Sequence, residues 1–410
     1  MRYLKFSVLL LFAAVLVLPF TYTSSVEGQA ITEALTTDMD ARTDDLFNNN
    51  GTAADFAEAQ IEFSGVEEIA DGVGPVYNAQ SCRECHQNPD TGAASQISEF
   101  RAGHLVGSTF VEAPGGSLIN DRAIDSDIQE RVSSNDPVRT FRMSISILGD
   151  GYVEALANTV LQNNVAAQPA AQRGTLINVE VFEAAGQTRI GRFGWKDQQA
   201  SLLSFSADAY VNEMGITSNF PQTDHENTSN GVSVAAFDNC GAGCVDPEDD
   251  TNEDIGLFAT FMRGLRAPAR GPITAQVSQG EALFDALGCD ICHTPSLTTA
   301  APGTLINGGA ATVSAALGNK RIHPYSDFAM HDVGTGDGIV QNGGQGTRNQ
   351  VRTAALWGAR ARIRLMHDGE SLTVNDAILR HGGQALTIRN NYNNLSNASK
   401  QAVIAFVLSL

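Results

Sequence analysis

The stretch NAQSCRECHQNP, residues 78–89, decides the fold, because it places Cys82 and Cys85 two residues apart with His86 directly after them. The same pattern returns in LGCDICHTPS, residues 287–296. In a c-type haem protein, two cysteines in this pattern form thioether bonds to the haem, and the adjoining histidine binds the iron. The sequence therefore predicts two covalently bound c-type haems, attached at Cys82, Cys85, Cys289 and Cys292, with His86 and His293 as iron ligands.

Two other interpretations of these motifs are weaker. A thioredoxin-like dithiol needs no histidine and sits in a βαβ setting, which the sequence does not predict around either motif. A zinc site needs four ligands, usually from two closely spaced pairs, whereas these motifs lie far apart and each has its own histidine. The remaining cysteines, Cys240 and Cys244, predict a small local disulfide if the chain is exported.

Residues 1–30 have the pattern of a secretory signal peptide. Arg2 and Lys5 form a basic start, an apolar run follows over residues 6–20, and the small residue Ala30 is a suitable last residue before cleavage. A permanent membrane tether is the alternative, but the apolar run is shorter than the roughly 20 residues that a spanning helix needs. We therefore expect an exported, periplasmic protein.

The formal net charge is −20 at pH 7. An acidic surface disfavours binding to nucleic acid or anionic lipid and would attract a basic partner protein. The simpler interpretation is that the acidic residues keep the protein in solution.

The sequence predicts a mainly α fold with two cytochrome c-like haem domains. Residues 31–270 would form the N-terminal haem domain with insertions, and residues 271–410 the C-terminal domain, because RAPARGPIT (266–274) is typical of a linker. A small β region is expected in the N-terminal half, where residues 175–195 indicate two short strands about an Ala-Gly turn. Residues 275–293 predict an amphipathic helix that ends on the second motif.

A weak internal repeat accompanies the two motifs. RFGWKDQQASL (192–202) is similar to RLMHDGESL (364–372), and each stretch precedes a predicted helix and follows one motif. Two diverged copies of one haem unit would explain the similarity, and chance similarity is the alternative.

With these stretches in view, the chain resembles the di-haem oxidoreductase (peroxidase) family, also labelled thiol oxidoreductase-like and related to bacterial di-haem cytochrome c peroxidases. The matching stretches include DGVGPVYNAQSCRECH, FATFMRGLRAPARGP, GEALFDALGCDICHTPSL, HPYSDFAMHDVGTGDG and AILRHGGQA. The resemblance implies an all-α cytochrome c-like core that occurs twice. It also implies that the N-terminal haem meets peroxide, while the C-terminal haem accepts electrons from a small cytochrome c or cupredoxin.

The resemblance further implies roles for single residues near the N-terminal haem. Trp195 would lie between the haems, and Glu213 would assist cleavage of the O–O bond. Phe205 stands where the peroxidases have a companion glutamine. His104 would be a displaceable ligand of the N-terminal haem.

For the C-terminal haem, the resemblance implies a methionine as second axial ligand, and Met366 is the best match, with Met330 and His331 as rivals. His381 is interpreted as a helix C-terminal residue favoured by the helix dipole. Calcium between the haem domains is possible without an assignment of residues, since the acidic loop 246–254 lacks EF-hand spacing.

We therefore expect a peroxidase-type redox enzyme. The alternatives are an electron carrier with both irons fully ligated, and an oxidase of an organic or protein substrate that uses a haem in a high oxidation state. A thiol–disulfide enzyme is the weakest alternative, because only Cys240 and Cys244 would be free of haem.

Overall fold

The computed structural model describes residues 30–38, 53–220, 231–237 and 253–410. The predicted signal peptide, apart from Ala30, and the predicted disulfide between Cys240 and Cys244 lie outside the described residues, as does most of the acidic loop 246–254. None of the helices in the described ranges is long and apolar enough to cross a membrane. Residues 31–410 form one compact unit.

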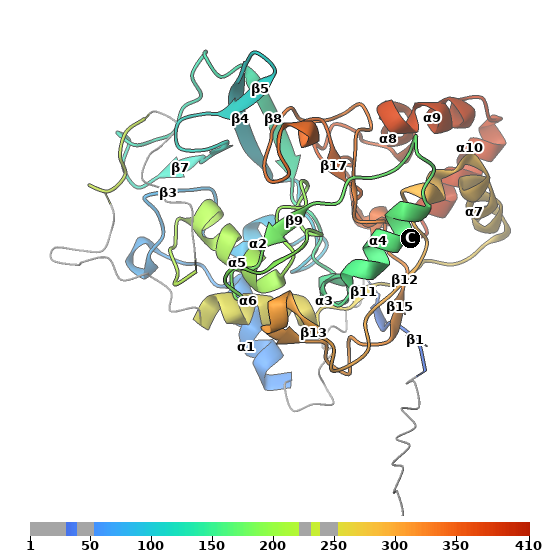
Figure 1. Cartoon of the computed structure of the whole chain (residues 1–410), viewed down its shortest axis with the longest axis horizontal. Coiled ribbons are helices and arrows are strands. Elements are labelled where there is room, and N and C mark those ends of the chain that lie inside the picture. The colour runs from blue at the N-terminus through green and yellow to red at the C-terminus, as the bar shows by residue number, and fades with distance from the viewer. Residues whose placement is uncertain (1–29, 39–52, 221–230, 238–252) are drawn as a thin grey trace, which may run out of the picture. The chain divides into compact units, whose positions relative to one another are not determined.

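The helices in the described part of the chain are short (Figure 1). They are α1 (Ala53–Ser64), α2 (Cys82–Cys85), α3 (Asp150–Glu154), α4 (Asn158–Ala167), α5 (Leu202–Ala209), α6 (Glu253–Gly264), α7 (Ala275–Leu287), α8 (Val374–Arg380), α9 (Leu386–Asn393) and α10 (Asn397–Val407). A π-helix, η2 (Tyr210–Met214), continues α5, and a 3-10 turn, η3 (Cys289–Ile291), carries the second motif.

The strands are short and occur in both halves of the chain. They are β1 (Thr32–Glu33), β2 (Thr36–Thr37), β3 (Val76–Tyr77), β4 (Ser98–Val106), β5 (Thr109–Glu112), β6 (Leu118–Ile119), β7 (Arg122–Ala123), β8 (Val138–Met143), β9 (Asn178–Glu180), β10 (Thr188–Ile190), β11 (Ala267–Pro268), β12 (Leu297–Thr298), β13 (Leu305–Ile306), β14 (Ala311–Thr312), β15 (Lys320–Ile322), β16 (Met330–His331) and β17 (Val351–Arg352). The fold thus combines helices with small sheets and is mixed α and β, where a mainly α fold was expected. The 39 glycines and 13 prolines interrupt helices and leave short extended segments that pair with one another.

The largest sheet lies in the N-terminal half, and β4 is its centre. This strand pairs antiparallel with β5, β6 and β8. The predicted hairpin within residues 175–195 is confirmed, since β9 and β10 pair antiparallel with Ile190 opposite Asn178. The sequence patterns did not predict a strand at β4, which carries Glu99.

In the N-terminal half, α1 packs against α6. Phe56, Ala59 and Phe63 recur at helical spacing and are buried on one face of α1. The Phe63 ring lies 4.6 Å from the ring of Phe261 on α6, measured between centroids. Burying each such aromatic side chain stabilises the fold by about 1.5–3 kcal/mol.

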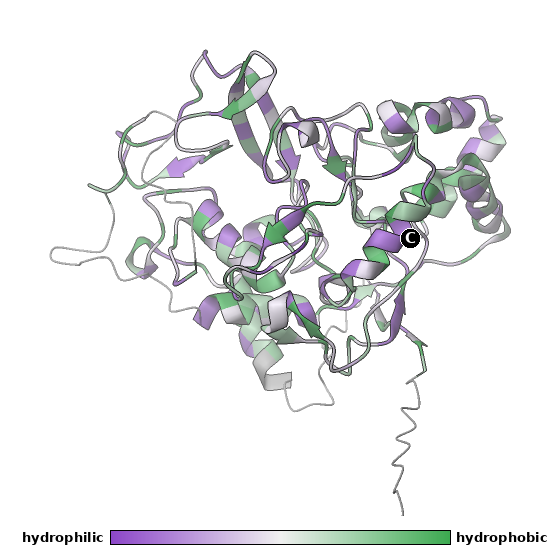
Figure 2. Ribbon diagram, viewed as in Figure 1, coloured by the Kyte–Doolittle hydropathy of each residue, from purple (hydrophilic) through white to green (hydrophobic). Residues whose placement is uncertain are grey.

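In the C-terminal half, α7 packs against α10 in the same manner (Figure 1). Phe284 of α7 meets Phe406 of α10 with ring centroids 5.1 Å apart. At Gly280 the two backbones approach so closely that a Cβ atom would collide with the carbonyl oxygen of Ala402. Helices throughout the chain carry hydrophobic and hydrophilic residues side by side, as amphipathic helices do (Figure 2). Each haem motif thus follows a helix that packs on a later one, while the domain boundary near residue 270 stays a prediction.

The helix before the second motif is shorter than predicted. It ends at Leu287, because Gly288 adopts a left-handed conformation with φ 87° and terminates it. Cys289 and Cys292 therefore lie at a separate turn. The first motif forms α2, whose N-terminus is capped by the Ser81 hydroxyl, which accepts a hydrogen bond from the Glu84 amide.

The two similar stretches form the same turn. Phe193 bridges to Gln199 in the first turn, and Leu365 bridges to Ser371 in the second. Positive φ values occur at matching places, at Gly194 and Asp197 in the first turn and at Met366 and Gly369 in the second. A helix follows each turn, α5 after the first and α8 after the second. The repeat inferred from the sequence is therefore present in the structure.

Candidate functional site

A cavity of about 1090 Å³ lies beside the first motif, with Cys82, Cys85 and His86 in its wall. The four motif cysteines are not joined in disulfides. Burial raises the pKa of Cys85 to about 12, and that of Cys289 also to about 12. Such thiols are poor nucleophiles at neutral pH, which argues against thiol–disulfide chemistry at these motifs.

His86 is oriented as an iron ligand would be. Its Nδ1–H donates to the carbonyl oxygen of Ala93 at 3.3 Å, which fixes the plane of the ring, and a second backbone hydrogen bond involves Ile145. Burial lowers the pKa of His86 to about 4, so the ring is neutral. The Phe63 ring of α1 packs beside it, 6.3 Å away between centroids.

His293 in the second motif repeats this arrangement. Its Nδ1–H donates to the carbonyl oxygen of Tyr325 at 3.1 Å, and Phe284 of α7 packs beside its ring at 6.0 Å. Burial, followed by the nearby His381, lowers the pKa of His293 to about 4. Both motifs thus combine two cysteines with a neutral histidine whose Nδ1–H donates to a backbone carbonyl oxygen, and this donor set fits a c-type haem.

A second histidine faces His293. The ring of His381, directly after α8, lies 6.4 Å from the ring of His293 between centroids. Its Nδ1–H donates to the carbonyl oxygen of Ala377, one turn earlier, at 2.8 Å. Sequence reasoning took His381 only for a helix-terminal residue and missed this contact.

The structure places the segment around Met366 against the N-terminal half. The Met143 amide donates to the carbonyl oxygen of His367 at 2.7 Å, and the His367 ring meets Trp195 edge-on at 6.1 Å. Met143 and Trp195 both line the cavity beside the first motif. Leu365, next to Met366, packs against the apolar cluster that contains Phe284 and that Cys289 also contacts, so the segment lies near the second motif as well. The role of Met366 as an iron ligand stays a prediction.

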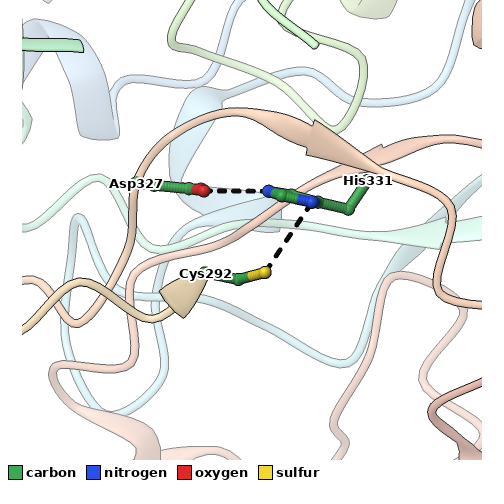
Figure 3. A group of neighbouring side chains, drawn as sticks. All are labelled: Cys292, Asp327 and His331. Atoms are coloured by element: carbon green, nitrogen blue, oxygen red, sulfur yellow. Dashed lines mark hydrogen bonds and ion pairs between the residues drawn. The ribbon is translucent and has the colours of Figure 1, made fainter. Parts of the chain in front are cut away.

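The two rivals of Met366 have other partners. Met330 is buried in an apolar cluster with Ile177, Val179 and Ala200. Both ring nitrogens of His331 are occupied: Nε2 lies 2.8 Å from Asp327 Oδ2, and Nδ1 lies 3.7 Å from Cys292 Sγ (Figure 3). Burial disfavours a charged His331, but the hydrogen bonds to Asp327 and Cys292 outweigh it and raise its pKa to about 10.

Cys292, Asp327 and His331 lie close enough together to hold a metal ion. A thioether bond to haem would remove the thiolate that such an ion needs, so the group competes with haem attachment. The Cys-x-x-Cys-His pattern favours the haem. His331 then packs against the sulfur of the thioether and holds Asp327.

Glu213 lies on η2 and lines the cavity beside the first motif. Its Oε2 accepts a hydrogen bond from Asn78 Nδ2 at 2.8 Å. Burial and the nearby carboxylate of Glu99 raise the pKa of Glu213 above the usual range of a glutamate. A π-helical segment of this kind occurs often at functional sites.

Glu99 on β4 is a cavity residue that sequence reasoning missed. Arg101 forms two hydrogen bonds with its carboxylate, at 2.7 and 3.0 Å. Burial alone would raise the pKa of Glu99, but Arg101 and Arg142 outweigh it and lower the pKa. Glu99 and Glu213 are thus a carboxyl pair with pKa values pushed apart, which is how proteins divide acid and base roles.

Trp195 and Phe205 also line this cavity. The indole N–H of Trp195 donates to the carbonyl oxygen of Met143 at 2.8 Å, which fixes the ring. Phe205 stacks on Phe193 at 6.3 Å. The polar companion of Glu213 is therefore Glu99, from another element, and Phe205 contributes an apolar wall.

His104 does not line the cavity in the described structure. It lies on β4, where its Nδ1 is 2.9 Å from Oδ1 of Asp136. The described contacts of the His104 ring join it to Asp136 and not to His86, and its role as a haem ligand stays a prediction.

The sequence signature of the family described as "Di-haem oxidoreductase, putative peroxidase" matches residues 116–410. No curated protein matches the chain. Among solved structures, the chain is similar to the diheme peroxidase BthA from Burkholderia thailandensis, at 14% identity over 93% of this chain and 92% of that chain, with a TM-score of 0.42. It is also similar to a MauG-like protein associated with microbial copper homeostasis, at 12% identity over 95% of each chain and a TM-score of 0.41.

Hydrazine synthase from Kuenenia stuttgartiensis is similar at 12% identity over the whole of both chains, with a TM-score of 0.39. Similarities to solved structures at these TM-scores carry no argument about function. The family signature, in contrast, covers well over half of the chain and includes the second haem motif. The protein therefore belongs to the di-haem oxidoreductase family, whose description is that of redox enzymes with two haems.

Proposed function

We propose that the protein is an exported, periplasmic di-haem enzyme that reduces peroxide at the haem held by Cys82, Cys85 and His86. The observation that carries this proposal is the buried carboxyl pair, Glu99 and Glu213, in the wall of the same cavity as the first motif. An electron carrier needs no acid–base pair beside its haem.

The haem iron would supply the site where peroxide binds and where electrons reach it. Glu213 in its ionised form takes the proton from one peroxide oxygen and returns it to the other, which leaves as water. Two electrons and two protons in all convert one hydrogen peroxide into two waters. Glu99, held ionised by Arg101 and Arg142, keeps the pKa of Glu213 high enough for this transfer.

The electrons would come from a small cytochrome c or cupredoxin that docks near the second haem. Trp195 is the residue by which they pass to the first haem, because its ring lines the cavity and meets His367 of the second turn. The net charge of −20 favours a donor with a basic surface. Cleavage after Ala30 would release the protein into the periplasm.

Peroxide turnover by the purified protein with a reduced small cytochrome tests this proposal. In Glu213→Gln, kcat/KM for hydrogen peroxide should fall by about 10²–10⁴, since that is the usual contribution of a positioned acid–base group. Glu58→Gln on the exposed face of α1 is the matched control and should keep the wild-type value. Absence of peroxide turnover in haem-loaded wild-type protein would leave an electron carrier as the function.

A further inference from the structure

We propose that His381 is the second axial ligand of the haem held by Cys289, Cys292 and His293, so that two histidines bind this iron. The inference rests on the proposed haem attachment at the second motif. It replaces Met366, which the family resemblance implied.

The geometry of the two rings carries the inference. Two imidazoles on opposite sides of one metal ion, with metal–nitrogen distances of about 2 Å, place their ring centroids roughly 6 Å apart. The rings of His293 and His381 are 6.4 Å apart. Among the contacts of the described residues, no hydrogen bond joins these two rings directly, and the distance between their centroids leaves room for one metal ion between them.

The hydrogen bonds of both rings point to the same role. Each Nδ1–H donates to a backbone carbonyl oxygen, that of Tyr325 for His293 and that of Ala377 for His381. Each Nε2 therefore carries the lone pair. A metal-binding histidine characteristically uses its second nitrogen in this way, because the hydrogen bond fixes the tautomer and the plane of the ring.

The surroundings of His381 suit a haem ligand. Leu365, Ile378 and Leu379 are partly buried apolar residues that pack against the core around Phe284. Ile378 and Leu379 belong to the same helix as Ala377, so α8 brings both the ligand and an apolar surface to the second motif. Apolar side chains against a haem exclude water from it.

The two repeated units carry different groups after their helices. In the first unit, the turn around Trp195 is followed by α5 and then by Glu213. In the second unit, the turn around His367 is followed by α8 and then by His381. Counted from the matching turns, Glu213 lies 18 residues after Trp195 and His381 lies 14 residues after His367, so the two residues do not occupy the same place of the repeat. The units differ in that a carboxyl group lies beside the first motif and an imidazole beside the second.

This difference would separate the two haems by function. With His293 and His381 both bound, the second iron has no free axial position, and it can only pass electrons. At the first motif, His86 is the one histidine in the cavity wall within the described residues, and Glu213 shares that wall. Peroxide would therefore react at the first haem alone.

Near-infrared magnetic circular dichroism and EPR of the haem-loaded protein test the inference. The wild-type ferric protein should show a low-spin species with the charge-transfer band of two imidazole ligands. His381→Ala should lose this species and gain a high-spin one. His381→Met should replace it with a histidine–methionine species of higher midpoint potential. Met366→Leu is the matched variant and should leave the species unchanged.

Two results would overturn the inference. One is a histidine–methionine spectrum in the wild type that Met366→Leu abolishes. The other is a low-spin spectrum that neither His381 variant alters, although both variants carry two haems by intact mass. Loss of the haem itself at Cys289 and Cys292 in wild-type protein would instead contradict the proposed function. The wild-type spectrum alone identifies the axial ligands of the haem at Cys289 and Cys292, even where a variant fails to fold.

Discussion

Single residues at the first haem site set its chemistry through their neighbours. The family resemblance implied Glu213 as the catalytic carboxyl, and the structure places this residue in the cavity beside the first motif. Its companion Glu99 could not be predicted, because it comes from a distant strand and no local pattern links β4 to η2. No local pattern in the sequence indicated a ligand role for His381, which became visible only through the contact of its ring with that of His293.

Replacing Glu99 should move the pH profile of peroxide turnover. Activity should rise with pH as Glu213 ionises, above the usual range of a glutamate, because burial and Glu99 raise its pKa. Glu99→Gln removes the like charge and leaves the cation of Arg101 near Glu213, so the pKa of Glu213 should fall. The rising limb of kcat/KM against pH should therefore shift to lower pH.

Glu112→Gln, at an exposed position of β5 in the wall of the same cavity, serves as the control and should leave the rising limb in place. A limb that stays unchanged in Glu99→Gln, or that moves to higher pH, would contradict the assignment of Glu213 as the proton-transfer group.

At the level of secondary-structure elements, two packed helix pairs, α1 with α6 and α7 with α10, support the two motifs. The sequence indicated the helix before the second motif and the hairpin of β9 and β10, because both follow clear local periodicity and turn signals. It did not indicate the end of α7 at Leu287 or the sheet around β4. A left-handed Gly288 and long-range strand pairing determine these features, and neither leaves a periodic pattern.

The close contact between α7 and α10 predicts that a larger residue at Gly280 destabilises the protein. In Gly280→Ala, the added methyl group would collide with the carbonyl oxygen of Ala402, so the two helices must move apart. We expect the free energy of unfolding to fall by about 1–3 kcal/mol. Urea unfolding followed by circular dichroism measures this change.

Gly256 on α6 provides the matched control, since a Cβ atom there meets nothing within 4 Å. Gly256→Ala should stabilise the protein by about 0.5–1 kcal/mol through its better helix propensity. Equal effects of the two substitutions would show that the close contact at Gly280 does not hold the helices together.

The whole molecule is joined by buried polar contacts between residues far apart in the sequence. Asp337 binds two cations of the N-terminal half, Arg142 at 2.7 Å and Lys196 at 2.9 Å. Lys196 also donates to backbone carbonyl oxygens of Thr347, Arg348 and Gln350. These contacts explain why residues 31–410 form one compact unit although the sequence predicts two haem domains.

Asp337→Asn should destabilise the protein by about 3–5 kcal/mol, because Arg142 and Lys196 would stay buried without their anion. Burial alone would raise the pKa of Asp337, but Arg142 and Lys196 outweigh it and lower the pKa. The stabilisation is therefore present above the ordinary range of an aspartate and is lost as the pH falls below it. Unfolding in urea at several pH values should show a difference between wild type and variant that shrinks in acid.

Asp127→Asn, at an exposed position, should change the free energy of unfolding by no more than about 0.5 kcal/mol. A small effect of Asp337→Asn at neutral pH would mean that Arg142 and Lys196 find other partners and that Asp337 does not join the halves.

At this largest scale, the motifs in the sequence predicted two haem units, and the repeat of turns and helices agrees with them. The sequence could not predict how the units meet. The contact between Trp195 and His367 joins matching places of the two turns, and it arises only when both are folded against each other.

The two haems are proposed to have different roles. The haem at Cys82 and Cys85 binds peroxide, and the haem at Cys289 and Cys292, with two histidine ligands, only transfers electrons. Optical and EPR spectra of the oxidised and reduced protein, taken with and without hydrogen peroxide, test this claim most directly. In the oxidised protein, the low-spin haem at Cys289 and Cys292 should keep its spectrum with peroxide, while the haem at Cys82 and Cys85 should change its spectrum. In the reduced protein, peroxide should oxidise both haems, because the second haem passes its electron to the first. Two low-spin haems that both stay unchanged with peroxide would contradict the claim.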